Sequence, residues 1–249
     1  MDLERLTWGW NTAFGETKNE RYKAALENFI RTYADFDISA LAMERMARVL
    51  QQEGDLVAAH KVAERGAQVF PQSVGGKLCR NLLLELEAKA VQISTERVWN
   101  CFDRTGILRL SENAQGGGDR SNACPKITIR YRNVDQVYFR AIPYNWEVFL
   151  QKRHNRPENL SQQERSEVLA TAFAHEWSEK LPPTSDYKEV TMPLAAPEQL
   201  KPGFYFIVAS HDPSFGAQEN QVSMAAVWVS DLSLVTRTRQ GQIEGFVLD

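Results

Sequence analysis

The first third of the chain carries apolar residues at intervals of three and four, the spacing of one face of an α-helix. This period runs from Lys18 to Ala90 and divides into four predicted helices. The first has its apolar face at Tyr22, Ala25, Leu26, Phe29, Ile30 and Tyr33, and the second at Leu41, Met43, Met46, Ala47, Val49 and Leu50. The third, which Asp55 should cap, extends to Phe70-Pro71, and the fourth covers about residues 77–90.

The predicted helices repeat at an interval of 34 residues, which is the tetratricopeptide period. The pairs at this interval are Tyr22/Leu56, Ala25/Ala59, Phe29/Ala63 and Asp37/Pro71. The stretch from Glu53 to Pro71 resembles the second half of such a repeat, with small residues where paired helices approach closely: Ala47, Ala59 and Gly66. Residues 1–90 should therefore form tetratricopeptide-like hairpins. A packing or spacing role is favoured, because a peptide-binding array usually needs about three repeats.

After Ala90 the period changes to the alternation of β-strands. Three runs alternate in this way, 91–98, 126–131 and 136–142, and the runs 204–210, 222–229 and 232–237 complete a set of short strands. Short strands of this kind, separated by turn residues, predict an antiparallel β-sandwich of the macroglobulin or immunoglobulin type over residues 91–239. The chain is thus expected to be an α+β protein in two parts.

Two segments of this half stand apart from the strand pattern. Ser161-Gln-Gln-Glu164 is a capping box, so a helix is expected to start there and to continue through Trp177, as an insertion at about 161–180 that packs on a sheet. The last ten residues, 240–249, alternate again directly after a turn at Gln240-Gly241. We interpret them as the start of a following domain.

Charge and hydropathy exclude several classes of function. The net charge of −3 offers no general attraction to nucleic acid or to anionic membranes. No run of about 18 apolar residues is present that would cross a bilayer, and the N-terminus lacks the pattern of a signal peptide.

The three cysteines lack the spacing of a zinc site. Cys79 lies among leucines and is expected to be a small buried apolar residue. Cys101 and Cys124 flank a glycine-rich loop and are a possible disulfide in an oxidising compartment.

No arrangement of residues typical of catalysis, metal binding or cofactor binding is recognisable, and we expect none of these sites. His60, His154, His175 and His211 are not spaced as metal ligands, and a solvated side chain is expected for each. The loop around Gly116-Gly-Gly-Asp119 lacks the lysine of a phosphate-binding loop, and no G-x-S-x-G nucleophile motif occurs. Arginines beside aromatic residues on the strands are interpreted as solvated sheet faces rather than as a nucleic-acid site.

Four segments of the second half resemble a known family. The segment 129–142, IRYRNVDQVYFRAI, resembles the second macroglobulin-type domain of bacterial alpha-2-macroglobulin-like proteins. The segments 200–208 (LKPGFYFIV) and 227–237 (VWVSDLSLVTR) resemble later strands of that domain, and 241–249 (GQIEGFVLD) matches the opening strand of the next one.

The resemblance implies a non-catalytic N-terminal scaffold piece of a large periplasmic, secreted or cell-envelope protein that traps proteases. Its partners would be the proteases, through the full-length parent, and the downstream macroglobulin domains. The surroundings of Cys79, Cys101 and Cys124 do not match the family's Cys-x-x-Gln thioester motif, and nothing resembles a bait region, so trapping would depend on downstream parts. Without the family, a cytoplasmic location is expected.

Two other functions stay open. The helices could serve as a protein–protein adaptor that grips a peptide, with Asn28, Arg31, Arg45 and Arg48 in a polar groove. Alternatively, the strands could form a carbohydrate-binding sandwich with exposed tryptophans, although Trp146, Trp177 and Trp228 fit core positions equally well.

Overall fold

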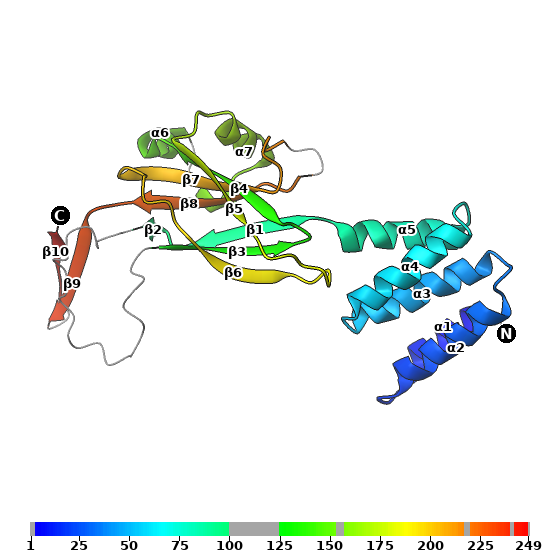
Figure 1. The fold of residues 1–249 in the computed structure, drawn as a ribbon. Coiled ribbons are helices and arrows are strands. Elements are labelled where there is room, and N and C mark those ends of the chain that lie inside the picture. Colours follow the sequence, from blue (N-terminus) through cyan, green and yellow to red (C-terminus); the bar gives the residue numbers. More distant parts are fainter. Residues whose placement is uncertain (1–2, 100–124, 153–156, 217–219, 240–241, 249) are drawn as a thin grey trace. The chain divides into compact units, whose positions relative to one another are not determined.

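The computed structural model describes residues 3–99, 125–152, 157–216, 220–239 and 242–248 of the 249-residue chain, and only the backbone from residue 233 onward. The chain forms two compact units (Figure 1). The helical unit comprises Met1–Ala88 and Thr184–Lys188, and the β unit comprises Lys89–Pro183 and Glu189–Asp249. Each unit is described by itself.

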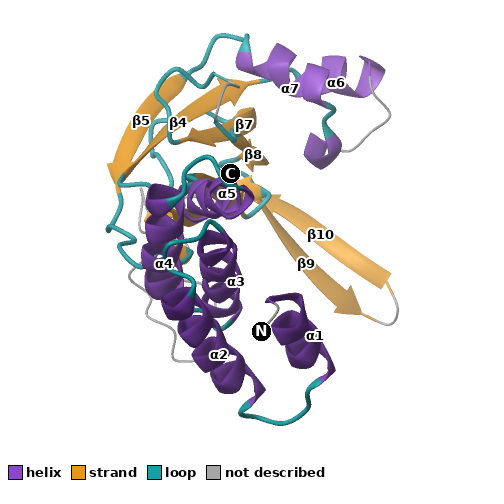
Figure 2. Cartoon of the chain, turned by 90° about the vertical axis from the view of Figure 1, so that its right-hand side faces the viewer, coloured by secondary structure: helices purple, strands orange, loops and turns teal. Residues whose placement is uncertain are grey.

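In the helical unit, the described residues form five helices: α1 (Leu3–Thr12), α2 (Lys18–Thr32), α3 (Ile38–Gln52), α4 (Leu56–Val69) and α5 (Val74–Glu87). Consecutive helices pack against each other, and α3 also packs against α5 (Figure 2). The four predicted helices are present, and the predicted cap is confirmed because Asp55 accepts a hydrogen bond from the backbone N–H of Ala58 at 3.0 Å. The sequence pattern did not indicate α1, which buries only Leu3 fully.

The helical core is closed by small residues at the helix contacts. Ala47, Ala59 and Cys79 are fully buried. A methyl group on Gly66 would lie 2.5 Å from the sulfur of Cys79, and one on Gly75 would lie 2.1 Å from the backbone nitrogen of Leu41. Backbones can approach this closely only where one of them has no side chain.

The described residues of the β unit form ten strands and two short α-helices. The strands are β1 (Ala90–Thr95), β2 (Val98–Trp99), β3 (Lys126–Arg132), β4 (Gln136–Pro143), β5 (His175–Lys180), β6 (Val190–Ala195), β7 (Gly203–Ser210), β8 (Ser223–Val229), β9 (Ser233–Arg239) and β10 (Gln242–Leu248). The helices are α6 (Trp146–Lys152) and α7 (Gln162–Leu169), with a 3₁₀ turn, η2 (Pro157–Asn159), between them.

The strands form three sheets, in the orders β1-β3-β6, β2-β8-β7-β4-β5 and β10-β9. All described pairs are antiparallel except the short pair of β2 with β8, which departs from the all-antiparallel expectation. The turn after Arg132 was expected between β3 and β4, and it carries the chain from one sheet to another, with Asn133 in the left-handed region at φ 56°. Asparagine tolerates this backbone conformation better than most residues.

Two apolar cores lie on the two faces of the five-stranded sheet. The first joins it to the three-stranded sheet through Ile127, Ile129, Tyr131, Val137, Phe139, Ile207 and Val227. The second joins it to α6 and α7 through Ile142, Phe149, Val168, Phe204, Phe206 and Val208 (Figure 1). Strand β7 contributes to both cores and is buried over nearly its whole length, which explains why its sequence is continuously apolar rather than alternating.

The predicted helix from Ser161 to Trp177 is wrong in its second half. The capping box forms as predicted, but the helix ends at Leu169, and residues 175–180 form β5 beside β4. Trp177 is there a cross-strand neighbour of Phe139, with stacked ring centroids 4.9 Å apart. The helical spacing of Leu169, Phe173 and Trp177 was therefore accidental, since Trp177 faces the core between the sheets.

The chain is thus an α+β protein, with helices followed by sheets, as the sequence predicts. None of the described helices is long and apolar enough to cross a membrane.

Candidate functional site: an aromatic pocket and a terminal hairpin

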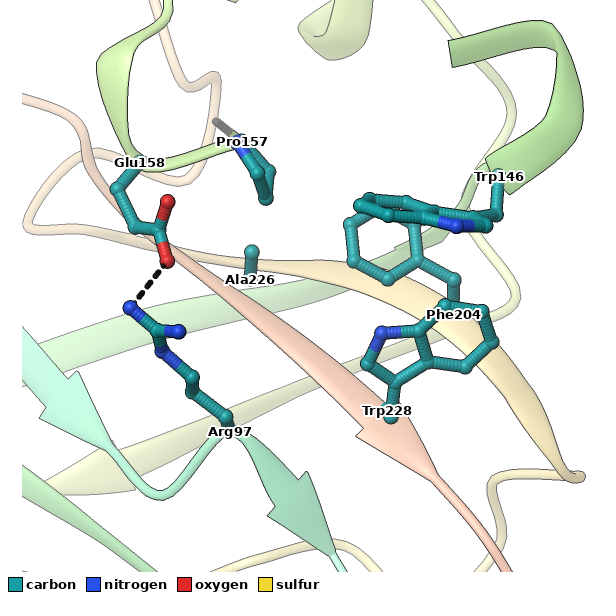
Figure 3. A pocket seen from close by; sticks show the side chains of 7 residues that line it. All are labelled: Arg97, Trp146, Pro157, Glu158, Phe204, Ala226 and Trp228. Atoms are coloured by element: carbon teal, nitrogen blue, oxygen red, sulfur yellow. Dashed lines mark ion pairs between the residues drawn. The ribbon is translucent and has the colours of Figure 1, made fainter. Parts of the chain in front are cut away.

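One face of the β unit carries a pocket of about 340 Å³ (Figure 3). Its wall is aromatic: Trp146 comes from the start of α6, Phe204 from β7 and Trp228 from β8. Arg97, from the turn before β2, and Glu158, from η2, form the opposite side, with Pro157 and Ala226 between. We call this cavity the aromatic pocket.

Trp146 is held by both the helix start and its ring neighbours. The side-chain oxygen of Asn145 accepts a hydrogen bond from the backbone N–H of Val148 at 3.0 Å, which fixes the first turn of α6. The Trp146 indole stacks on Phe149 with centroids 5.5 Å apart and an interplanar angle of 13°. Phe149 is buried against Phe204 and Phe206, so the indole lies on a packed base.

Trp228 forms a second wall at a steep angle to the first. Its ring centroid lies 5.5 Å from that of Trp146 at 70°, and 5.2 Å from that of Phe204. Trp228 is 37% exposed, whereas Phe204 beneath it is 5% exposed. Within the described residues, neither Trp146 nor Trp228 uses its indole N–H in a hydrogen bond.

The polar side of the aromatic pocket is an ion pair. A terminal nitrogen of Arg97 lies 2.8 Å from a carboxylate oxygen of Glu158, with 75% and 41% of the two side chains exposed. The backbone ties Arg97 to the aromatic wall, because its carbonyl accepts a hydrogen bond from the N–H of Trp228 at 2.7 Å. An ion pair this exposed contributes little to stability, about 0–1 kcal/mol.

The chemistry of this arrangement is that of binding. Among the described residues that line the pocket, Arg97 and Glu158 are the only ionisable ones, and none is a serine, cysteine or histidine. The pocket offers apolar ring faces, a donor-only guanidinium and an acceptor-only carboxylate. Such a site can orient a ligand but brings no nucleophile to it.

The second candidate site is the terminal hairpin, β9 with β10. The two strands pair antiparallel along their whole length, from Gln242 opposite Arg239 to Leu248 opposite Ser233. Neither is hydrogen-bonded to any other strand in the part of the chain that the structure describes. Two-stranded hairpins are marginal in water, and each has two edges with unpaired backbone groups.

Two of the polar residues proposed for an adaptor groove, Arg45 and Arg48, join neighbouring helices. A guanidinium nitrogen of Arg45 donates to the carbonyl oxygen of Leu3 at 3.0 Å, and Arg45 also pairs with Glu4, so it ties α3 to α1. Arg48 bridges Glu44 on its own helix, at 3.2 Å, and Glu85 on α5, at 2.7 Å. Arg31 donates to Asn28 one turn earlier, at 2.9 Å. Arg45 and Arg48 thus already have carboxylate partners within the helical unit.

The histidines are less solvated than expected. His60 pairs with Glu87 at 2.7 Å, and His175 stacks on Trp177 at 5.4 Å. His211 is partly buried, and its Nδ1 has no hydrogen-bond partner among the residues that the structure describes. His154 lies outside the described residues. No group of three or more His, Cys, Asp or Glu within the described ranges could hold a metal ion.

Burial of His211 lowers the pKa of its imidazole below the ordinary 6.5, and the nearby Lys89 adds to this effect, against an opposing effect of Asp212. Because unfolded His211 then binds more protons than folded His211, its contribution to stability should be lost as the pH drops below about 6.5 and be fully present above it. This is measured by urea titrations at pH 7.5 and at pH 5. The urea concentration at the unfolding midpoint should fall less between these two pH values for His211→Gln than for the wild type. His175→Gln is the control and should follow the wild type. An equal loss in all three proteins would contradict the role of His211.

Of the three cysteines, the structure describes Cys79. Cys101 and Cys124, the possible disulfide, lie outside the described residues. Cys79 is a free, fully buried thiol, as expected for a small apolar residue.

Burial raises the pKa of the Cys79 thiol to about 12. The thiolate is the reactive species, so Cys79 should resist alkylation by iodoacetamide at pH 8 in the native protein and react after denaturation. Peptide mapping by mass spectrometry measures this for Cys79 separately from the other two cysteines. Rapid labelling of Cys79 under native conditions would show that the core around α5 opens.

The sequence indicates part of the aromatic pocket. Trp146 and Trp228 are candidates there for either a core or a sugar-binding face, and both line the pocket in the structure. The sequence pattern missed Arg97, Glu158 and Phe204, whose positions in the sequence give no sign that they meet. Trp177, the third tryptophan named, lies in the core between the sheets instead.

No protein-family model matches the sequence, and searches of curated proteins and of solved structures found no significant match.

Proposed function

We propose that the chain is a non-catalytic N-terminal scaffold piece of an alpha-2-macroglobulin-like protein that traps or inhibits proteases at the cell envelope. The single observation that carries the proposal is the terminal hairpin, a two-stranded sheet that pairs with no other described strand. Hairpins of this kind gain stability when another element covers or extends them. In the proposed parent, that element is the next macroglobulin domain.

The family motifs fall on elements that support this proposal. The segment 129–142 covers most of β3, the turn between sheets and most of β4, while 200–208 covers most of β7. The segment 227–237 runs from β8 into β9, and 241–249 contains β10. The motifs thus lie on strands β3, β4, β7 and β8 of the two larger sheets and on the terminal hairpin. The protein would provide structure and leave protease capture to downstream parts of the parent.

Hydrogen exchange on two forms of the protein tests the scaffold role. We expect the amides of β10 to exchange quickly in the 249-residue chain, and at least about 100-fold more slowly in a form that is extended by the next domain of the proposed parent. The amides of β7 serve as the internal control and should not change. Equal exchange of β10 in both forms would contradict the docking of a following domain.

Protease capture is tested on the full-length parent. A protease trapped by it should keep its activity on a short peptide substrate and lose activity on a large protein substrate. The 249-residue chain alone should change neither. Unchanged cleavage of both substrates in the presence of the parent would remove the trapping function from the proposal.

The alternative role as a peptide-gripping adaptor has less support. Arg45 and Arg48, two of the three basic residues assigned to its groove, are held by the ion pairs that join α3 to α1 and α5. Pull-down with the intact chain remains its direct test.

A further inference from the structure

We propose that the aromatic pocket binds a neutral pyranose ring of a glycan. The inference concerns a site that the scaffold role does not use, and it does not rest on that role. Its starting point is an exposed tryptophan beside an exposed ion pair in a cavity of about 340 Å³. This volume lies near the lower end of the range for small-molecule pockets, about 300–1,000 Å³. It therefore suits one or two sugar rings.

The apolar wall matches one face of a pyranose. Such a ring has a face of C–H groups that packs on the electron-rich face of an indole. Trp146 and Trp228, at 70° to each other, form a corner with Phe204 behind it (Figure 3). The stacking of Trp146 on Phe149 holds this corner in place before any ligand arrives, which reduces the entropy lost on binding.

The polar side matches the rim of hydroxyls on the same ring. Arg97 can only donate hydrogen bonds and Glu158 can only accept them, whereas a hydroxyl does both. Two adjacent hydroxyls can therefore bond to both partners while the ion pair stays intact. The indole N–H of Trp228, unbonded within the described residues, adds a donor.

A charged ligand fits the pocket less well. A cation attracted to the indole faces would be repelled by Arg97, and an anion attracted to Arg97 would be repelled by Glu158. Either would have to separate a pair that is already formed at 2.8 Å. A neutral ligand with both donors and acceptors avoids this cost.

Fluorine NMR of protein labelled with 5-fluorotryptophan tests the proposal, because the six tryptophans report separately. The probes are chitotriose, cellotriose and galactobiose, each added up to about 20 mM, with L-tyrosinamide as a cationic aromatic comparator. We expect at least one sugar to shift the Trp146 and Trp228 signals along a saturating curve with a Kd of about 1 mM. The signals of Trp8, which is exposed on the helical unit, and of Trp177 should not move.

Variants then separate the site from non-specific effects. Trp228→Ala should weaken sugar binding at least about tenfold, and Arg97→Gln or Glu158→Gln about three- to tenfold. Trp8→Ala is the matched control for the aromatic variant. Arg130→Gln is the control for the ion pair, because Arg130 and Glu189 form a similarly exposed pair at 3.6 Å on the other sheet. Both controls should leave the binding curve unchanged.

Three results would overturn the proposal. These are the absence of saturable shifts with every sugar, shifts with L-tyrosinamide alone, and binding that Trp228→Ala leaves intact in a folded protein. The thermal unfolding of each variant shows whether it is folded, and the ion-pair variants alter only exposed side chains. None of these results bears on whether the hairpin docks a following domain.

Discussion

Replacing Gly75 by alanine is expected to destabilise the helical unit by about 3 kcal/mol. A Cβ at this position would lie 2.1 Å from the nitrogen of Leu41 and 2.4 Å from the carbonyl carbon of Ala40. Both are backbone atoms, so α5 must move away from the start of α3 rather than a side chain rotate. Overpacking of this kind typically costs about 1–3 kcal/mol, and a clash with rigid backbone belongs at the upper end.

The matched control for this change is Gly9→Ala, the same chemical change in α1. Nothing lies within 4 Å of a Cβ built on Gly9. Alanine favours a helix over glycine by about 1 kcal/mol, so Gly9→Ala should leave stability unchanged or raise it. In thermal unfolding the Gly75 variant should lose more than about 10 °C and the Gly9 variant none.

Hydrogen exchange locates the effect of the Gly75 substitution. The amides of α3 and α5 should lose protection while those of β4 and β7 keep theirs, because the new methyl group meets only the helical unit. If Gly75→Ala proved as stable as the wild type, the close approach of α5 to α3 would be wrong.

Replacing Phe139 by alanine is expected to cost about 3–5 kcal/mol in the β unit. Phe139 is fully buried on β4 in the core shared by the two larger sheets, and its ring stacks on Trp177 across the β4–β5 pair. Removing the ring loses its burial and leaves a cavity that rigid strands on both sides cannot close.

Phe173→Ala is the control for Phe139→Ala. Phe173 is 47% exposed and has the guanidinium of Arg140 over its ring at 4.9 Å, so its removal should cost about 1 kcal/mol or less. Phe139→Leu keeps most of the apolar volume, so its loss of unfolding free energy should lie between those of Phe139→Ala and Phe173→Ala. It also provides a measurement if Phe139→Ala does not fold. Urea titrations measure the unfolding free energy of each variant. Equal costs at Phe139 and Phe173 would contradict the core between the sheets.

The difference between the correct and the wrong sequence predictions has a physical cause. The helices α2–α5 were predictable because the apolar face of each repeats every three to four residues. Asp55 also caps α4. Both signals depend on residues that are only a few positions apart. The capping box at Ser161 was correct for the same reason. The end of α7 was not, because Trp177 fits a helix face by spacing but is drawn into a strand by its contact with Phe139.

The sequence by itself determined much of the local order of this protein: that helices α2–α5 form, that a helix starts at Ser161, where the period changes from helix to strand, and which residues are apolar enough to be buried. Only the tertiary structure decided which strands pair, that the turn after Arg132 changes sheets, and that α3 and α5 meet at a glycine. It also brought Arg97 and Trp228, far apart in the chain, to the same pocket. The helical period and the helix caps act through interactions between residues that are close together in the chain. Pairing and pocket formation depend on contacts between distant segments, and no local pattern encodes them.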